Sequence, residues 1–393
     1  MSAALINHSP DLKRLRDEGY SIEVKYGHLL VYDVPYVTSA KAVALGTLVS
    51  ALTLASPERA GQPANHVCDF IGEYPCKADG TPIPGIRNSS GDVKLADGII
   101  INHRFSARPN PAYPDFYAKM TTYIGIISGP AQAIKPDATA RTFRLVQDGP
   151  SDSFLLYTDT NASRAGIVPL MDKVKGMRVA IIGLGGTGSY VLDLLAKCPI
   201  AEIALFDGDL FQQHNAYRAP GAASDEDLKK AQMKVEYLAA VYSRMHKGIR
   251  AHAVYLDQNN VHELAGFNFV FICIDRPPVK QWLFRHLTDM GVPFVDTGID
   301  VEKVEDKLVA MVRVTAADAQ HKDHLPQRVS FADAEGDEEY KDNIQIAELN
   351  MLNAALAVIR WKRMVGFYAD LEQEFHSLYS LNNAHLVNHD LAN

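Results

Sequence analysis

The chain is poor in cysteine and tryptophan and has no long apolar run. Its four cysteines form no CxxC pair and have no spacing typical of a disulfide framework, so we expect reduced thiols. No stretch approaches the roughly 18 uncharged apolar residues of a membrane span, and the N-terminus lacks the apolar core of a signal peptide. These absences predict a cytoplasmic protein with no membrane segment.

An excess of basic residues is also missing. The chain has 39 Lys and Arg against 47 Asp and Glu, a net charge of −8, which argues against a general nucleic-acid surface because phosphate backbones are also negative. With 393 residues it is longer than one typical core, so two domains are expected. A turn-rich break predicts an N-terminal α+β accessory domain over 1–150 and a second domain over 160–393.

The most informative stretch runs from Met177 to Asp209. Arg178 to Ile182 is a short β-branched run typical of a strand buried on both faces, and apolar residues at helical spacing follow from Ser189 to Lys197. A second such strand, Ile203 to Phe206, ends at the position where a dinucleotide-type unit has its ribose-binding carboxylate. The turn between the first strand and the helix has four glycines, which let phosphate oxygens approach the helix N-terminus: Gly183, Gly185, Gly186 and Gly188.

Six polar residues follow the glycine turn in a fixed order: Asp207, Asp209, Asn215, Arg218, Lys234 and Asp275. A glycine turn alone is weak evidence for one ligand, because NAD- and FAD-binding domains use it as well. The glycines and this ordered set together resemble the ThiF/MoeB and ubiquitin-activating enzyme superfamily. The resemblance covers about residues 160 to 365.

This resemblance implies an α/β fold, a Rossmann-like, doubly wound and mainly parallel sheet that forms a ThiF-type adenylation domain. Such a domain joins a protein carboxylate to the α-phosphate of ATP with the help of Mg²⁺. The resemblance implies that Asp207 holds the ribose and that Asp209 binds the cofactor or only caps the turn. It implies that Asn215, Arg218 and Lys234 contact phosphates. Asp275 is implied to hold Mg²⁺ or to position the attacking carboxylate. Lys229 or Lys230 could take the place of Lys234.

In this family an arginine ahead of the glycine strand reaches the ATP phosphates of the other subunit of a homodimer. Arg164 is the best match, and a surface arginine is the alternative. Two family features are missing. The chain has no CxxC pairs for structural zinc, and no cysteine between Thr297 and Asn393 to accept the modifier as a thioester. Either the acyl-adenylate passes directly to another protein, or a hydroxyl or an N-terminal thiol replaces that step.

Two stretches of the N-terminal region are unusual. Residues 66–76 contain His66, Cys68 and Cys76, which with His103 fit no usual zinc spacing, so packing roles are favoured over a metal site or a reactive thiol. Residues 108–120 are rich in aromatic side chains, which either dock a partner or pack on their own domain.

The N-terminal region also resembles the domain found ahead of ThiF-type modules in bacterial ubiquitin-like conjugation operons. This implies that the substrate is the C-terminal glycine of a ubiquitin-like protein, with a conjugating-enzyme-like partner and a role in antiphage defence.

Several elements are predicted from periodicity alone. We expect a helix, or a strand and a helix, over residues 40–54, one helix over 225–243, and a helix with a polar tail over 370–393. His321 and His324 are expected in a solvated loop rather than at a metal or substrate.

We interpret the chain as a homodimeric, ATP- and Mg²⁺-dependent adenylating enzyme for a ubiquitin-like protein. One rival activates a sulfur-carrier protein for cofactor biosynthesis. Another is a non-catalytic nucleotide-binding scaffold, against which the presence of both Arg218 and Asp275 argues. An NAD- or FAD-dependent oxidoreductase is disfavoured, because it has no need of Asn215 and Arg218.

Overall fold

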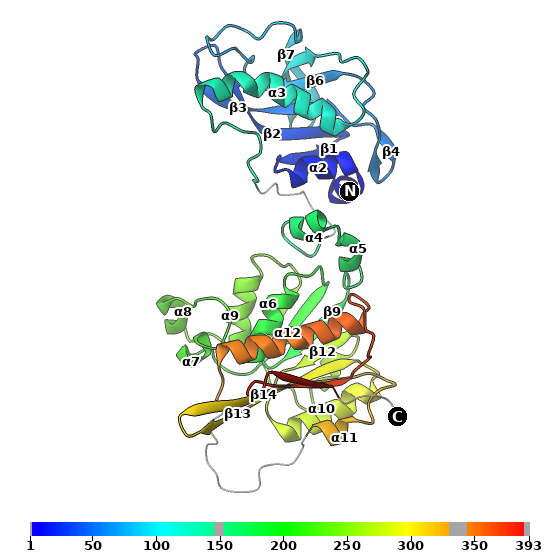
Figure 1. Cartoon of the computed structure of the whole chain (residues 1–393), viewed down its shortest axis with the longest axis vertical. Helices are drawn as coiled ribbons and strands as arrows, with labels where there is room; N and C mark the ends of the chain where they lie inside the picture. The colour runs from blue at the N-terminus through cyan, green and yellow to red at the C-terminus, as the bar shows by residue number, and fades with distance from the viewer. Residues whose placement is uncertain (1, 145–152, 330–343, 389–393) are drawn as a thin grey trace. The chain divides into compact units, whose positions relative to one another are not determined.

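A computed structural model describes residues 2–144, 153–329 and 344–388 (Figure 1). The chain forms two compact units. The N-terminal unit comprises Met1–Asp152 with Tyr157–Ile167, and the C-terminal unit comprises Ser153–Leu156 with Val168–Asn393. The domain end expected at residue 150 lies outside the described residues. In the described part of the chain, no helix has the length and apolar character needed to cross a membrane.

A six-stranded antiparallel sheet forms the centre of the N-terminal unit. Its order is β1-β2-β3-β6-β8-β7. The strands are β1 (Ile22–Lys25), β2 (His28–Val37), β3 (Val43–Ala51), β6 (Val67–Ile71), β7 (Arg87–Ala96) and β8 (Ile99–Ser106). The helix allowed over residues 40–54 is wrong, since these residues form β3 and β4 (Leu54–Ser56), which pairs with β5 (Arg59–Ala60). Pairing of β3 with β2 and β6 overrides the helix propensity of its alanines and leucines.

Helix α3 (Phe116–Ile134) packs on this sheet, and α1 (Ser2–His8) and α2 (Pro10–Asp17) complete the unit. Asp115 caps α3 by accepting a hydrogen bond from the backbone N–H of Ala118 at 2.7 Å. Phe116, at the start of the helix, is fully buried, and Tyr113 just before it is nearly so. These two aromatic residues of the 108–120 stretch therefore pack in their own domain.

The sheet of the C-terminal unit has the order β11-β10-β9-β12-β13-β14-β15-β16. The first five strands in this order are parallel and the remaining pairings are antiparallel, which confirms the predicted α/β fold. The strands are β9 (Arg178–Ile182), β10 (Glu202–Phe206), β11 (Ile249–His252), β12 (Phe269–Ile272), β13 (Phe294–Val304), β14 (Lys307–Ala317), β15 (His376–Ser380) and β16 (His385–Asn388).

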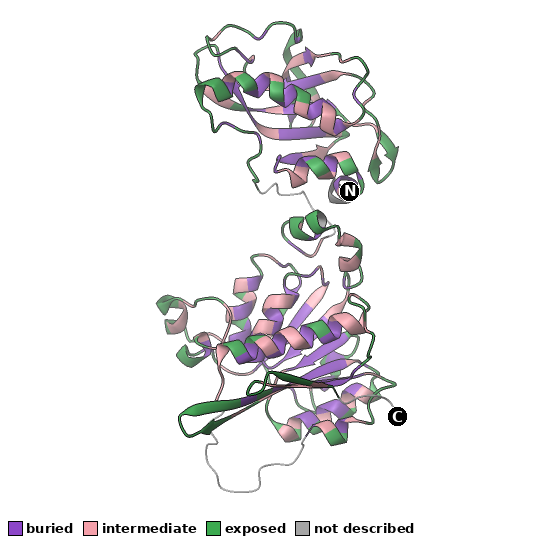
Figure 2. Ribbon diagram, viewed as in Figure 1, coloured by how far each residue is buried: buried purple, intermediate pink, exposed green. Residues whose placement is uncertain are grey.

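Helices cover both faces of this sheet, and its central strands are buried between them (Figure 2). One face packs against α6 (Gly186–Leu195), α9 (Lys234–Tyr242) and α12 (Ala347–Met364). The other packs against α10 (Pro277–Asp289), the 3-10 turn η1 (Val261–Leu264) and α11 (Leu325–Arg328). The shorter helices of this unit are α5 (Val168–Met171), α7 (Gln213–Ala216) and α8 (Asp225–Lys229), whereas α4 (Thr160–Ala165) belongs to the N-terminal unit.

Two predicted helices of this unit are corrected by the structure. The single helix over 225–243 is broken into α8 and α9 at Ala231, which has a positive φ of 48°. Residues 376–388 form β15 and β16 instead of a helix, and β15 extends the sheet by pairing with β14. Short strands at a sheet edge depend on a neighbour that lies far away in sequence, which periodicity does not reveal.

Candidate active site

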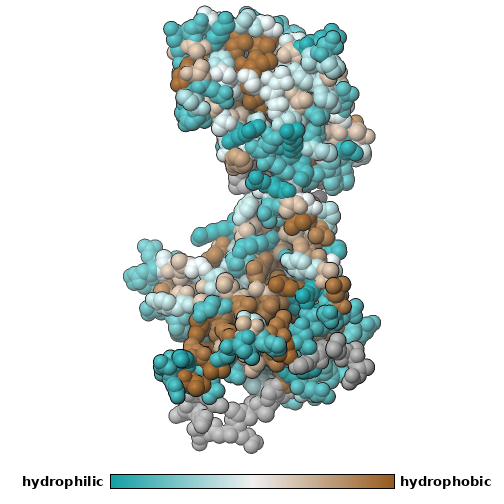
Figure 3. Space-filling view, viewed as in Figure 1, coloured by the Kyte–Doolittle hydropathy of each residue, from teal (hydrophilic) through white to brown (hydrophobic). Residues whose placement is uncertain are grey.

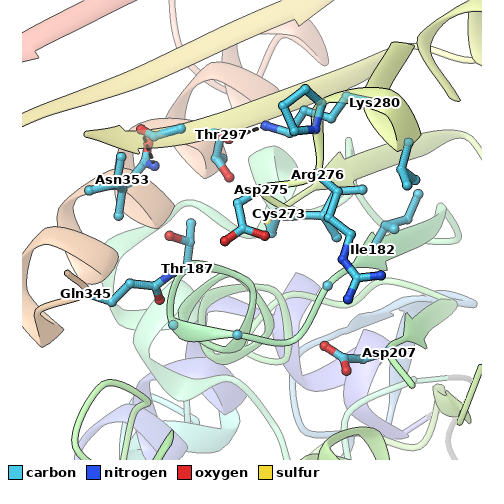
Figure 4. A pocket seen from close by; sticks show the side chains of 18 of the residues that line it. Ile182, Thr187, Asp207, Cys273, Asp275, Arg276, Lys280, Thr297, Gln345 and Asn353 are labelled. Carbon is cyan, nitrogen blue, oxygen red and sulfur yellow. Dashed lines mark hydrogen bonds between the residues drawn. The ribbon is translucent and has the colours of Figure 1, made fainter. Parts of the chain in front are cut away.

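A pocket of about 610 Å³ opens at the carboxyl ends of the parallel strands of the C-terminal unit (Figure 4). In doubly wound sheets this edge is where ligands bind. Most of the residues predicted for the site line this pocket: Gly183, Gly185, Gly186, Asp207, Asp209, Arg218, Lys234 and Asp275.

The glycine loop between β9 and α6 is shaped by close backbone contacts. Gly183 has a φ of +87°, and a Cβ there would lie 2.7 Å from the carbonyl oxygen of Cys273. A Cβ at Gly188 would lie 1.9 Å from the carbonyl oxygen of Gly183, so Gly188 packs beneath the loop and does not line the pocket. Gly185 caps α6, whose first N–H groups therefore face an open space suited to an anion.

Asp207 holds this loop against the end of β10. One of its carboxylate oxygens accepts a hydrogen bond from the backbone N–H of Leu184 at 2.6 Å, and the other accepts one from the backbone N–H of Asp209 at 2.8 Å. Its side chain is nearly buried but still lines the pocket. The same carboxylate thus fixes the glycine loop and retains lone pairs for a ligand.

Asp209 and Lys234 form an ion pair in the pocket wall. The Nζ atom of Lys234 lies 2.6 Å from Asp209 Oδ2 and 3.8 Å from Asp207 Oδ1. Burial opposes ionisation of Asp209, but hydrogen bonds from Lys234 and Tyr255, together with the charge of Lys234, outweigh it and lower the pKa of Asp209. Lys229 and Lys230, the alternatives to Lys234, instead pair with carboxylates of α8 and do not line the pocket.

Arg218 enters the pocket from the loop after α7. Burial lowers the pKa of its guanidinium, while the charges of Asp275 and Asp209 oppose that shift. Its buried Nε atom has no hydrogen-bond partner among the described residues. Asn215, three residues earlier, is buried outside the pocket lining, where its side-chain amide oxygen Oδ1 accepts a hydrogen bond from the backbone N–H of Gln212 at 2.8 Å. Asn215 thus shapes the turn that presents Arg218.

The predicted arginine from outside the domain, Arg164, is exposed in α4 of the N-terminal unit. It is not among the residues that line the pocket of the C-terminal unit.

The sequence analysis missed a charged cluster in the same pocket. Asp296, on β13, is fully buried and binds both Lys280 of α10, at 2.8 Å, and Arg313 of β14, at 2.7 Å. Lys280 also donates to the carbonyl oxygen of Thr297 at 3.1 Å, and Asn353 of α12 donates to that of Gly298 at 3.0 Å (Figure 4). In the sequence, the only local signal for this cluster is that Asp296 follows the apolar pair Phe294-Val295.

Three of the four cysteines, Cys68, Cys76 and Cys198, are buried, and Cys273 is half-buried at the pocket wall. Burial raises the pKa of Cys273, which lines the pocket, and of Cys68 to about 12, and it also raises the pKa of Cys76. A protonated thiol is a poor nucleophile, so the geometry disfavours these three as acyl acceptors near neutral pH.

The candidate metal-site histidines of the N-terminal unit bind serines. His66 lies 3.0 Å from the hydroxyl of Ser106 and His103 lies 3.0 Å from that of Ser90. Within residues 2–144, 153–329 and 344–388, no three His, Cys, Asp or Glu side chains gather as metal ligands.

His321 and His324 also lie outside the pocket lining. His321 contacts Asp318 and stacks on Phe375, while His324 bonds to the carbonyl oxygen of Ala316.

Sequence comparison matches the N-terminal and the C-terminal region of the chain to two different domain families. Residues 159–315 match the ThiF family, and residues 10–160 match a domain of unknown function, DUF6791. The ubiquitin-like modifier-activating enzyme 5 of Oryza sativa subsp. japonica is 21% identical over 217 residues, covering 52% of this chain and 50% of that protein. The adenylyltransferase and sulfurtransferase UBA4 of Saccharomyces cerevisiae (strain YJM789) is 24% identical over 133 residues, covering 33% and 30%. The chain thus spans half the length of these relatives or less.

Similar solved structures include E. coli MccB with MccA-N7isoASN, at 18% identity and a TM-score of 0.47 over 58% of this chain and 69% of that one. E. coli MccB with ATP matches at 19% identity and a TM-score of 0.44, with the same coverage of both chains. The glycine loop and the ordered polar residues from Asp207 to Asp275 all fall within residues 159–315, so the part of the chain that lines the glycine-loop end of the pocket is the part that matches the ThiF family.

Proposed function

We propose that the chain adenylates the C-terminal glycine carboxylate of a ubiquitin-like protein with ATP. The observation that carries this proposal is one pocket that joins the glycine loop to Arg218, Lys234 and Asp275. Both reactants are anions, so a site for this reaction must neutralise charge and align the two groups. The pocket lining has more cationic side chains than carboxylates. The six cations are Arg218, Lys234, Arg276, Lys280, Arg313 and Arg328, and the four carboxylates are Asp207, Asp209, Asp275 and Asp300.

The nucleotide would occupy the end of the pocket at the glycine loop. The first N–H groups of α6 and the guanidinium of Arg218 suit phosphate oxygens, and Asp207 suits a ribose hydroxyl. Asp275 also fits a magnesium ion, because its exposed carboxylate faces the pocket and Mg²⁺ is commonly held by one or two carboxylates and substrate phosphates. When bound there, Mg²⁺ would shield the phosphate charge.

The acyl substrate would enter from the Lys280 end. Asp296 is shared by Lys280 and Arg313, which leaves this cluster with one positive charge in excess for a carboxylate. A Cβ at Gly298 would lie 2.7 Å from the Arg313 guanidinium, so this part of the wall is close-packed, which suits a terminal residue without a side chain.

In the reaction, a substrate carboxylate oxygen forms a bond to the α-phosphorus as the bond to the pyrophosphate leaving group breaks. Arg218 and Lys234 would hold the phosphate oxygens, and Lys280 and Arg313 would orient the carboxylate. Direct transfer of the acyl group to another protein fits the chain, because the thiols of Cys68, Cys76 and Cys273 all have raised pKa values.

The resemblance supports a cytoplasmic homodimer that works with a conjugating-enzyme-like partner in a bacterial antiphage pathway. Exposed apolar residues on α12, including Met351 and Ile359, add support for a protein contact on that helix. Figure 3 shows apolar residues gathered on this face of the C-terminal unit. In a homodimer, Arg164 would approach the partner's nucleotide.

ATP–pyrophosphate exchange tests the proposal. With Mg²⁺ and a ubiquitin-like protein that ends in glycine, the wild-type chain should exchange label, and Asp275→Asn should lower the rate by about 10²- to 10³-fold, as for other groups that stabilise transition-state charge. Asp289→Asn, on the exposed end of α10, is the matched control and should exchange normally.

Two outcomes would contradict the adenylation proposal. One is exchange by Asp275→Asn at the wild-type rate. The other is nucleotide binding without exchange for any glycine-ended carrier, which would favour the scaffold. Running sulfur-carrier proteins beside ubiquitin-like proteins separates the two carrier classes, since the yeast relative is named as a sulfurtransferase as well as an adenylyltransferase.

A further inference from the structure

Arg276 is a pocket cation whose backbone is fixed by the sequence around it. It lies between Asp275 and two prolines, and it caps α10, which begins with Pro277. A residue before proline is restricted to extended conformations, and Arg276 has φ −98° and ψ 100°. The direction in which its side chain leaves the backbone is therefore set before any ligand binds.

An aromatic ring holds the Arg276 side chain within the pocket. Its guanidinium carbon lies 5.3 Å from the centre of the Tyr255 ring, and the side chain extends on the side where Asp207 lies (Figure 4). Tyr255 itself packs on Gly208, where a Cβ would lie 2.6 Å from the ring, and its hydroxyl donates to Asp209. Because Asp209 also binds Lys234, one continuous set of contacts joins Arg276 to that lysine.

Three other cationic side chains of the pocket form ion pairs with carboxylates. Lys234 is paired with Asp209, and Lys280 and Arg313 are paired with Asp296. Among the described residues, no carboxylate lies within 4.0 Å of the Arg276 guanidinium. This group instead lies over the aromatic ring of Tyr255. Stacking on a ring leaves the N–H groups of an arginine available for a planar, bidentate contact with an anion.

We propose that Arg276 binds the phosphates of the nucleotide in the pocket of its own chain, with Tyr255 as the residue that positions it. This inference rests on the proposed function only in taking a nucleoside triphosphate as the ligand. It gives the pocket a second phosphate-binding arginine from the same chain, in addition to Arg218.

Equilibrium binding to the full chain tests this role without requiring turnover. We compare α,β-methylene-ATP with adenosine, which has no phosphate. Arg276→Gln should weaken binding of the ATP analogue by about 10- to 100-fold, the range for losing hydrogen bonds to a charged group, and leave adenosine within about twofold. Arg276→Lys should recover part of the loss. Arg285→Gln, an exposed arginine on the same helix, is the matched control and should bind both ligands normally.

The positioning role of Tyr255 is tested by a double-mutant cycle. Tyr255→Ala should weaken binding of the analogue less than Arg276→Gln does, and combining them should add little to Arg276→Gln alone. Tyr255→Phe keeps the ring and should retain most of the affinity.

Several results would overturn the inference. Analogue binding by Arg276→Gln at the wild-type affinity would do so, as would equal weakening of adenosine. Unchanged analogue binding with a raised KM for the carboxylate protein in exchange would assign Arg276 to that substrate instead. If wild-type protein binds the analogue through Arg276 but never exchanges pyrophosphate, the inference stands and the adenylation proposal fails.

Discussion

The two units of the chain bury lysines in different ways. In the N-terminal unit, Lys119 of α3 is 1% exposed and its ammonium donates to the hydroxyl of Ser50 at 2.9 Å. In the C-terminal unit, Lys280 is 6% exposed, but its ammonium lies 2.8 Å from the carboxylate of Asp296. One buried amine thus has a neutral partner and the other a full counter-charge.

The buried charge of Lys119 lowers the stability of its unit, whereas the buried charge of Lys280 forms part of the pocket wall. Burial lowers the pKa of Lys119, and the nearby Cys68 and Asp69 oppose the shift only in part. Lys280 shares Asp296 with Arg313 at the wall of the pocket, where an excess positive charge can meet a ligand. We expect the C-terminal unit to depend on its buried carboxylate and the N-terminal unit to gain from losing its buried amine.

The largest effect is expected for Asp296→Ala. This change leaves Lys280 and Arg313 in the interior without a counter-ion, which should lower the free energy of unfolding of the C-terminal unit by about 3–5 kcal/mol. Trp282 and Trp361 both lie in this unit, so urea unfolding followed by tryptophan fluorescence reports on it.

Glu302→Ala, exposed on the same strand, is the control for Asp296→Ala and should change stability by less than about 0.5 kcal/mol. If Asp296→Ala unfolds at the same urea midpoint as the wild type, the ion pairs of Asp296 do not contribute to the stability of the C-terminal unit.

A smaller effect of opposite sign is expected for Lys119→Met. Methionine fills a similar volume without an amine that must be desolvated, and should stabilise the N-terminal unit by about 1–3 kcal/mol. Ser50 keeps a hydrogen bond to the carbonyl oxygen of Ala51. Hydrogen exchange of β3 and α3 peptides in the full chain measures the gain, with the exposed Lys135→Met as the control.

The gain from Lys119→Met should also depend on pH. Because the folded-state pKa of Lys119 is lowered from 10.5, the cost of its charge is fully present below that lowered pKa and disappears as the pH rises toward 10.5. The two proteins should therefore converge in stability with rising pH. A pH-independent difference, or a loss of stability at neutral pH, would mean that packing of the lysine outweighs its charge.

The smallest effect is expected for an exposed lysine. Lys229 pairs with Asp225 on the surface of α8, where such pairs contribute little, so Lys229→Met should change binding of an ATP analogue by less than about twofold. Lys234→Met, by contrast, removes the buried partner of Asp209 and should weaken binding of the analogue. Equal losses for both variants would favour Lys229 as the phosphate ligand.

Local patterns predicted the elements around the glycine loop well. The predicted strand 178–182 coincides with β9, and the predicted strand 203–206 differs from β10 by one residue at its start. Strands buried on both faces in a parallel sheet are continuous apolar runs, and such runs are visible without knowing their neighbours. The helices allowed within residues 40–54 and 376–388 were wrong, because the strands found there are stabilised by pairing with distant segments.

The amino-acid sequence by itself determined the glycine loop, the parallel strands around it and the chain order of the polar residues that line the pocket, because each depends on local backbone geometry and apolar pattern. Only the tertiary structure decided which other charges join them. Antiparallel pairing places Arg313 opposite Gly298 and close to Asp296, and the loop after β11 brings the Tyr255 ring next to the Arg276 guanidinium. Such contacts join segments far apart in the chain, so they exist only once the sheet has assembled.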